Sequence, residues 1–181
     1  MPSLVSPHDS LILDACCAIN LFATDQAGPI LRTVGCPIVV ARYVAERDLL
    51  SLAALPLTGN ETLDKRLARH ATAIIDLQEE EEEQFFALAA QMDDGEAITA
   101  AIAISRRWAI ATDERKVGLI LSRTAPTIHV VTTPELVKHW AEQSAVDGIL
   151  LHSVLADIED KARFRPWRTH PLYEWWRSYV R

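Results

Sequence analysis

The chain has 181 residues, of which 49% are hydrophobic and 24% are charged, and its formal net charge is −7. This composition is typical of a soluble globular domain, and no apolar run reaches the roughly 18 residues that a membrane-spanning helix needs. The acidic total excludes a protein that binds polyanions over its whole surface. Residues 161–181 nevertheless carry six basic residues and one acid, so a local basic rim beside an acidic site remains open.

The order of apolar patterns predicts alternating strands and helices. Strands are expected at SLILDA (10–15), GCPIVVA (35–41), WAIATDE (108–114) and IHVVTT (128–133). Helices are expected at 18–26, 42–55, 79–92, 94–107, 115–123 and 134–145, with a loop at 56–62. The stretch 63–77 is open between helix and inserted segment. This alternation predicts an α/β fold in which helices cover both faces of a parallel sheet.

One domain is expected over residues 1–181, with a closing helical segment at about 145–181. The tryptophans of that segment, Trp167, Trp175 and Trp176, are expected to serve packing. The five glutamates at 79–83 are expected to be the solvated first turns of a helix, where the helix dipole favours acids.

The three cysteines, Cys16, Cys17 and Cys36, form a poor disulfide framework because their number is odd and two are adjacent. No CxxC or HExxH spacing indicates zinc. The cysteines are therefore expected to be small apolar fillers beside a strand. The N-terminal residues lack the features of a signal peptide, and a cytoplasmic protein is expected.

Carboxylates follow two of the predicted strands. Asp14 ends the first strand and Asp113 ends the third. The carboxyl ends of parallel strands share one edge of a sheet, and ligands bind there where the strand order reverses. The two acids would meet if their strands are neighbours. Asp14 has no cationic partner in its sequence surroundings, and a buried unpaired carboxylate is costly.

Three further acids lie near the starts of predicted helices. Glu46 follows the second strand, and Asp94 and Glu96 open the helix before the third, although topology alone need not bring Glu96 to Asp14. Each acid also has an ordinary explanation, since Asp94 and Asp113 suit helix caps and Glu46 suits an exposed helix face. If the acids converge, a divalent cation would make them tolerable together. Ligands that are all oxygen select Mg²⁺ or Mn²⁺.

Four ordered segments carry a resemblance to a known family. LILDACCAINLFA, VARYVAERDLL, MDDGEAITAAIAISRRWAIATDERKV and IHVVTTPELV resemble the successive motifs of PIN-domain nucleases, in the style of VapC-like toxins and related prokaryotic PIN proteins. The resemblance covers roughly residues 10–140. It implies a three-layer α/β/α sandwich with a parallel sheet of about five strands. It also implies a Mg²⁺- or Mn²⁺-dependent endoribonuclease that hydrolyses RNA phosphodiesters with a metal-activated water.

The resemblance assigns the family's metal-binding and catalytic acids to Asp14, Glu46, Glu96 and Asp113. Asp94 becomes an auxiliary ligand or only a cap. Asn20 matches a polar position where an amide can hydrogen-bond a carboxylate of the cluster, and Thr112 matches a hydroxyl residue before the fourth acid. Many relatives carry Thr, Ser or Asn just after the first acid, where this chain has Ala15 and Cys16. Support for the metal site from those two positions is therefore in question.

RNA phosphates have candidate contacts in Arg106, Arg107, Arg115, Lys116 and the basic C-terminal segment, although a solvated helix face explains any single one of them. The resemblance also implies an antitoxin partner that inserts a basic side chain into the acidic cluster, and a homodimer. Two other interpretations stay open. One is a non-catalytic PIN scaffold that binds RNA or a protein. The other is a phosphatase-like or receiver-like α/β protein with Asp14 as phosphoryl acceptor.

Overall fold

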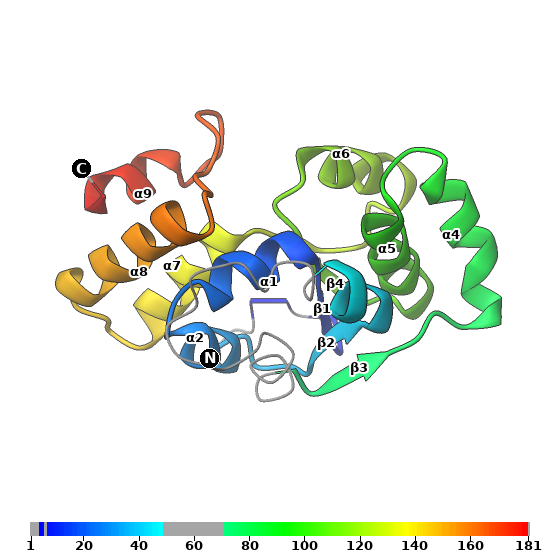
Figure 1. Cartoon of the computed structure of the whole chain (residues 1–181), viewed down its shortest axis with the longest axis horizontal. Helices are drawn as coiled ribbons and strands as arrows, with labels where there is room; N and C mark the ends of the chain where they lie inside the picture. The colour runs from blue at the N-terminus through cyan, green and yellow to red at the C-terminus, as the bar shows by residue number, and fades with distance from the viewer. Residues whose placement is uncertain (1–3, 6, 49–70, 181) are drawn as a thin grey trace.

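A computed structural model describes residues 4–5, 7–48 and 71–180 of the chain (Figure 1). Its centre is a parallel sheet of five strands in the order β3-β2-β1-β4-β5. The strands are β1 (Leu11–Leu13), β2 (Ile38–Ala41), β3 (Ala73–Ile75), β4 (Ala109–Ala111) and β5 (Val130–Val131). The residues of β1, β2 and β4 are all buried, as expected for strands covered by helices on both faces.

Helices account for most of the remaining described chain. They are α1 (Ala15–Phe22), α2 (Ala27–Arg32), α4 (Glu82–Ala89), α5 (Asp94–Arg106), α6 (Arg115–Thr124), α7 (Thr133–Gln143), α8 (Gly148–Lys161) and α9 (Tyr173–Tyr179), with a π-helix at Val44–Asp48 and a 3₁₀ turn at Glu79–Glu81. Helix α5 packs against β1, β2 and β4 with α4 and α6 beside it, whereas α1, α2 and α7 pack together elsewhere on the sheet (Figure 1). The expected three-layer α/β/α sandwich is confirmed.

The four strands predicted from the sequence are confirmed, and β3 lies within the open stretch 63–77. Helix α2 was not predicted. The predicted helix at 42–55 is a π-helix over Val44–Asp48, and its remainder and the predicted loop at 56–62 lie outside the described residues. The closing segment forms α8 and α9, which lie side by side (Figure 1).

The buried core runs from Val5 to Trp176, which is the largest fully buried side chain. The Trp176 ring meets Phe164 edge-on at 5.9 Å, and its indole N–H donates to the Glu159 carboxylate at 2.9 Å. The expected packing role is thus confirmed for Trp176. No helix in the described part of the chain is long and apolar enough to cross a membrane.

The glutamate run is only partly solvated, which corrects the prediction for one member. Glu81 is 3% exposed and forms an ion pair with Arg106, whose Nε lies 2.6 Å from its Oε1. Arg106 lowers the pKa of Glu81 against the opposing effect of burial. The pair fastens the turn before α4 to the C-terminal end of α5.

The order of the strands positions the candidate site. Strands β1 and β4 are neighbours, with Leu13 opposite Ala111. The chain goes from β1 to β2 in one direction and from β4 to β5 in the other, so the strand order reverses between β1 and β4. Ligands of open parallel sheets bind outside the carboxyl ends of the strands at such a point. Asp14 and Asp113 follow these two strands.

Candidate metal centre

Asp14 is the N-cap of α1 and lies directly after β1. Its Oδ1 accepts a hydrogen bond from the backbone N–H of Ala15 at 2.8 Å, and its Oδ2 accepts one from the Thr112 hydroxyl at 2.9 Å. The side chain is 3% exposed, and burial raises its pKa against the opposing effect of these hydrogen bonds. Within the described residues no basic side chain forms an ion pair with it.

Asp113 is held just as firmly at the end of β4. Its Oδ1 accepts from the backbone N–H of Thr133 at 2.9 Å. Its Oδ2 accepts from the Thr133 hydroxyl at 2.5 Å and from the Asn20 amide at 2.8 Å. Burial nevertheless raises the pKa of Asp113. The Asn20 contact is the one the resemblance implies, and α1 supplies it from a position six residues after Asp14.

Cys16 contacts both Asp14 and Asp113. Its thiol donates to Asp14 Oδ2 at 3.3 Å, and its sulfur accepts from the backbone N–H of Asp113 at 3.2 Å. The neighbouring Cys17 thiol donates to Asp113 Oδ2 at 3.3 Å. The prediction that these cysteines only fill apolar space is therefore wrong. Cys16 supplies a contact at the position where a hydroxyl or amide was expected from the resemblance.

A cleft of about 660 Å³ opens beside Asp14. Its lining includes the carboxylates of Asp14, Asp93, Asp94, Glu96 and Glu114 and, among the described residues, no lysine or arginine. Capping geometry explains part of this arrangement. Asp93 is the N-cap of α5, and the Glu96 carboxylate accepts from its backbone N–H at 3.3 Å. The prediction that Asp94 is the N-cap is thus wrong by one residue.

Glu96 lies within electrostatic reach of the other acids. Burial raises the pKa of Glu96, and the negative charges of Asp14, Glu114 and Asp93 raise it further. The start of α5 and the end of β1 are therefore brought together, which topology alone did not require. Crowded carboxylates of this kind resist full ionisation unless a cation compensates them.

Glu46 does not join this group. The Glu46 side chain is 60% exposed, and its carboxylate lies 3.5 Å from Arg42 Nη1. Glu46 does not line the acidic cleft. The segment that contains Glu46 is a π-helix and not the α-helix expected from the sequence. The ordinary explanation of Glu46, an exposed helical residue, fits the structure better than a place in the cluster.

The predicted RNA-contacting residues separate into two pairs. Arg106 is committed to Glu81, and Arg107 ends α5 with a left-handed backbone (φ 55°); both lie at the opposite end of α5 from Glu96. Arg115 and Lys116 open α6, directly after Asp113 and Glu114. Only this second pair lies beside the cluster.

Several site residues were not predicted. Asp93, Glu114 and Tyr43 line the cleft, and the Tyr43 hydroxyl donates to Asp94 at 3.4 Å. Thr133 supplies two hydrogen bonds to Asp113. Asp93 and Glu114 could have been found from the sequence, because each is an acid directly beside a predicted ligand, Asp94 or Asp113. Nothing in the local sequence marks Tyr43 or Thr133.

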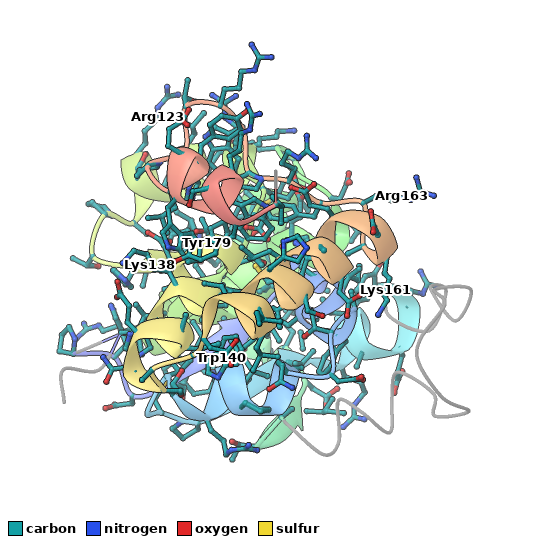
Figure 2. All side chains as sticks on the ribbon, turned by 90° about the vertical axis from the view of Figure 1, so that its left-hand side faces the viewer. Arg123, Lys138, Trp140, Lys161, Arg163 and Tyr179 are labelled. Atoms are coloured by element: carbon teal, nitrogen blue, oxygen red, sulfur yellow. The ribbon has the colours of Figure 1, made fainter. Side chains whose placement is uncertain are left out.

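Asp113 does not line the acidic cleft. It lines a neighbouring pocket of about 320 Å³, which shares Cys16, Ile19 and Glu114 with that cleft. Arg163 lies on the rim of this pocket, at the end of α8, where its backbone takes φ 57°. Figure 2 shows Arg163 and Lys161 at the same end of α8. Arg163 is exposed and forms no ion pair with any described residue.

The donor atoms fit a hard cation better than a soft one. Cys16, Cys17 and Asp113 also bring their ligand atoms within 4.8 Å of one another, which is a thiol-containing alternative. Burial raises the pKa of the Cys17 thiol, and the charge of Asp113 raises it further. Because the thiolate is the form that binds metal, Cys17 is a poor ligand as a protonated donor to Asp113. The cleft itself offers carboxylate oxygens, which suit Mg²⁺ and Mn²⁺.

Comparisons with known proteins identify no family for the chain, since neither a family model nor a curated protein matches it.

Proposed function

We propose that the protein is a Mg²⁺- or Mn²⁺-dependent endoribonuclease that hydrolyses RNA phosphodiester bonds. The observation that carries this proposal is the cleft at the reversal point of the sheet, whose lining includes five carboxylates and no basic side chain among the described residues. A bound cation would offset this concentration of negative charge and let the carboxylates ionise together. No described residue of this lining is a lysine, which favours metal chemistry over a phosphoryl-acceptor role for Asp14.

The proposed ligands are Asp14 and Glu96, with Asp113 completing the site and Asp94 and Glu114 available beside them. A divalent ion supplies an activated water and stabilises the charge that develops on the leaving oxygen. Thr112 orients Asp14, and Asn20 and Thr133 orient Asp113. Residues that orient ligands in this way are expected to affect metal affinity. Glu46 is left out of the ligand set because of its exposure and its ion pair with Arg42.

The substrate backbone is proposed to lie between α6 and the end of α8. Arg115 and Lys116 open α6 next to Asp113, and Arg163 stands on the rim of the pocket that contains Asp113. Cations placed on either side of an acidic site can hold phosphates while the ion offsets the acids. The basic C-terminal segment thus takes part through Arg163.

The resemblance to PIN-domain nucleases extends the proposal to a biological role. The chain is proposed to act as the toxin of a toxin–antitoxin pair or as an RNA-processing enzyme, to form a homodimer, and to bind an antitoxin through the acidic cleft. A cytoplasmic location belongs to the same proposal, and the three free cysteines of the structure are consistent with a reducing compartment.

Cleavage of a mixed RNA panel tests the function. The native protein should cleave with Mg²⁺ or Mn²⁺ and lose this activity in chelator. Asp14→Asn and Asp113→Asn should be inactive, whereas Glu79→Gln, an exposed control outside the cleft, should keep full activity. Metal-independent cleavage, or full activity in both aspartate variants, would refute the proposed metal-dependent nuclease activity. Absence of both cleavage and metal binding in the folded native protein would favour the non-catalytic scaffold.

A further inference from the structure

An apolar pocket of about 260 Å³ lies next to the acidic cleft, between α6, β5 and the segment that joins α8 to α9. Gly118, Leu119 and Val130 provide its apolar lining, and the Trp167 indole forms one wall. Leu119 is 54% exposed, so the fold itself does not cover this surface. The volume is below the roughly 300–1,000 Å³ of sites for drug-sized ligands, and it suits one small planar group.

Trp167 is rigidly supported. Its ring meets the buried His170 imidazole edge-on, with centroids 4.8 Å apart. His170 Nδ1 accepts from the backbone N–H of Leu172 at 3.0 Å, and its Nε2 lies 3.1 Å from the Thr132 hydroxyl. That hydroxyl already donates to Glu135, so the imidazole donates to it. A wall fixed in this way loses little conformational freedom when a ligand packs against it.

The pocket adjoins the proposed catalytic site. Glu114 lines both the acidic cleft and this pocket, and Thr112, which hydrogen-bonds Asp14, also lines the pocket. Arg115 also lines the pocket, and its guanidinium carbon lies over the Trp167 ring, 5.6 Å from the ring centre. A ligand in this pocket therefore contacts the Trp167 ring, the Arg115 guanidinium and the Glu114 carboxylate. Glu114 directly follows the proposed metal ligand Asp113 in the chain.

We infer that this pocket holds one nucleobase of the RNA, packed against Trp167, while the adjoining phosphate lies at the acidic cleft. The inference rests on the proposed ribonuclease function. Aromatic side chains commonly stack on the bases of single-stranded nucleic acids, and Arg115 supplies the charge that a phosphodiester backbone needs. An apolar side chain of a protein partner would not use the Arg115 cation in the pocket lining, so the observations favour the base.

Binding of two oligonucleotides tests the inference without cleavage. The Asp14→Asn protein with Mg²⁺ is titrated, by fluorescence anisotropy, into a labelled eight-nucleotide RNA and into its fully abasic ribose-phosphate counterpart. Uridine and adenosine versions are both used. Trp167→Ala and Trp167→Phe are added to the Asp14→Asn background. Trp175→Ala is the matched control, because Trp175 packs against Tyr179 in α9 and does not line the pocket.

Trp167→Ala should weaken binding of at least one base-bearing RNA by about fivefold or more, the usual worth of one stacked base. It should leave the abasic oligomer unchanged, and Trp167→Phe should keep most of the affinity. Equal losses for both oligomers, or no loss for either, would overturn the base pocket and leave it for a protein side chain. Because Asp14→Asn lacks a proposed metal ligand, the titration is repeated with the native protein and Ca²⁺, a cation that oxygen ligands also hold. If neither oligomer binds to either protein, the RNA substrate itself is wrong and the inference falls with it.

Discussion

Replacing Asp14 with asparagine is expected to stabilise the metal-free protein at neutral pH. Burial raises the pKa of Asp14 in the folded chain, so the folded state holds this proton more tightly than the unfolded state does. The free energy of unfolding of the native protein therefore falls as pH rises from the unfolded pKa through the folded one. Asparagine carries no charge and does not incur this cost.

The size of the effect follows from linkage. Between the ordinary aspartate pKa of about 3.9 and the raised pKa in the fold, the native protein should lose about 1.4 kcal/mol per pH unit relative to Asp14→Asn. Asparagine keeps an oxygen for the Ala15 N–H but changes the contacts with Thr112 and Cys16. That change adds a constant of about 1 kcal/mol that does not vary with pH. The pH-dependent part of the difference in free energy of unfolding therefore reports the ionisation of the Asp14 carboxylate.

Urea unfolding in chelator, followed by tryptophan fluorescence between about pH 4.5 and 8, measures this difference. Asp160→Asn, on an exposed position of α8, serves as the control and should track the native protein at every pH. The titrations of groups away from Asp14, including His170, are common to the proteins and cancel. Glu96, whose pKa the charge of Asp14 raises, widens the gap in the same direction. A gap between native and Asp14→Asn that is independent of pH, or one that favours the native protein increasingly as pH rises, would refute the reasoning.

Three further predictions follow from the site and its surroundings. Asn20→Ala should lower Mn²⁺ affinity about 10- to 100-fold, measured by calorimetry, because its amide no longer orients the carboxylate at the end of β4; unchanged affinity would contradict that role. In the same titration Glu96→Gln should weaken binding, whereas Glu46→Gln should leave it within about twofold, since Glu46 is exposed and ion-paired; the reverse order would restore Glu46 to the ligands. Arg106→Ala should cost about 3 kcal/mol in urea unfolding, because it leaves the buried carboxylate of Glu81 unpaired. A cost near zero would show that this pair is not structural.

The central strands could be predicted because each is a short run of apolar residues ended by a polar one. β3 could not, since Ala73 is exposed and Ile74 and Ile75 are half-buried, which gives neither a buried run nor a clean alternation. Helix α2 contains Gly28 and Pro29, which are weak helix formers. Its packing against α7, more than a hundred residues later in the chain, compensates for this, and no local pattern records such a contact.

The candidate site divides in the same way. Asp14 and Asp113 could be located because strand ends are marked locally. Their contacts with a common neighbour, Cys16, depended on β1 and β4 being adjacent in the sheet. Arg106 forms an ion pair with Glu81, which lies 25 positions earlier in the chain. A pattern of apolar residues does not reveal such a pair. The role of Cys16 depended on the distance of its sulfur from two residues at the end of β4.

The position of bound Mn²⁺ in crystals of the native protein, located by anomalous scattering, tests the central claim most directly. We predict a peak within about 2.0–2.3 Å of an Asp14 oxygen, with Glu96 or Asp113 as a further ligand, and no peak in Asp14→Asn crystals grown under the same conditions. A peak bound instead by the sulfurs of Cys16 and Cys17, or an ion-free cleft at saturating Mn²⁺, would contradict it.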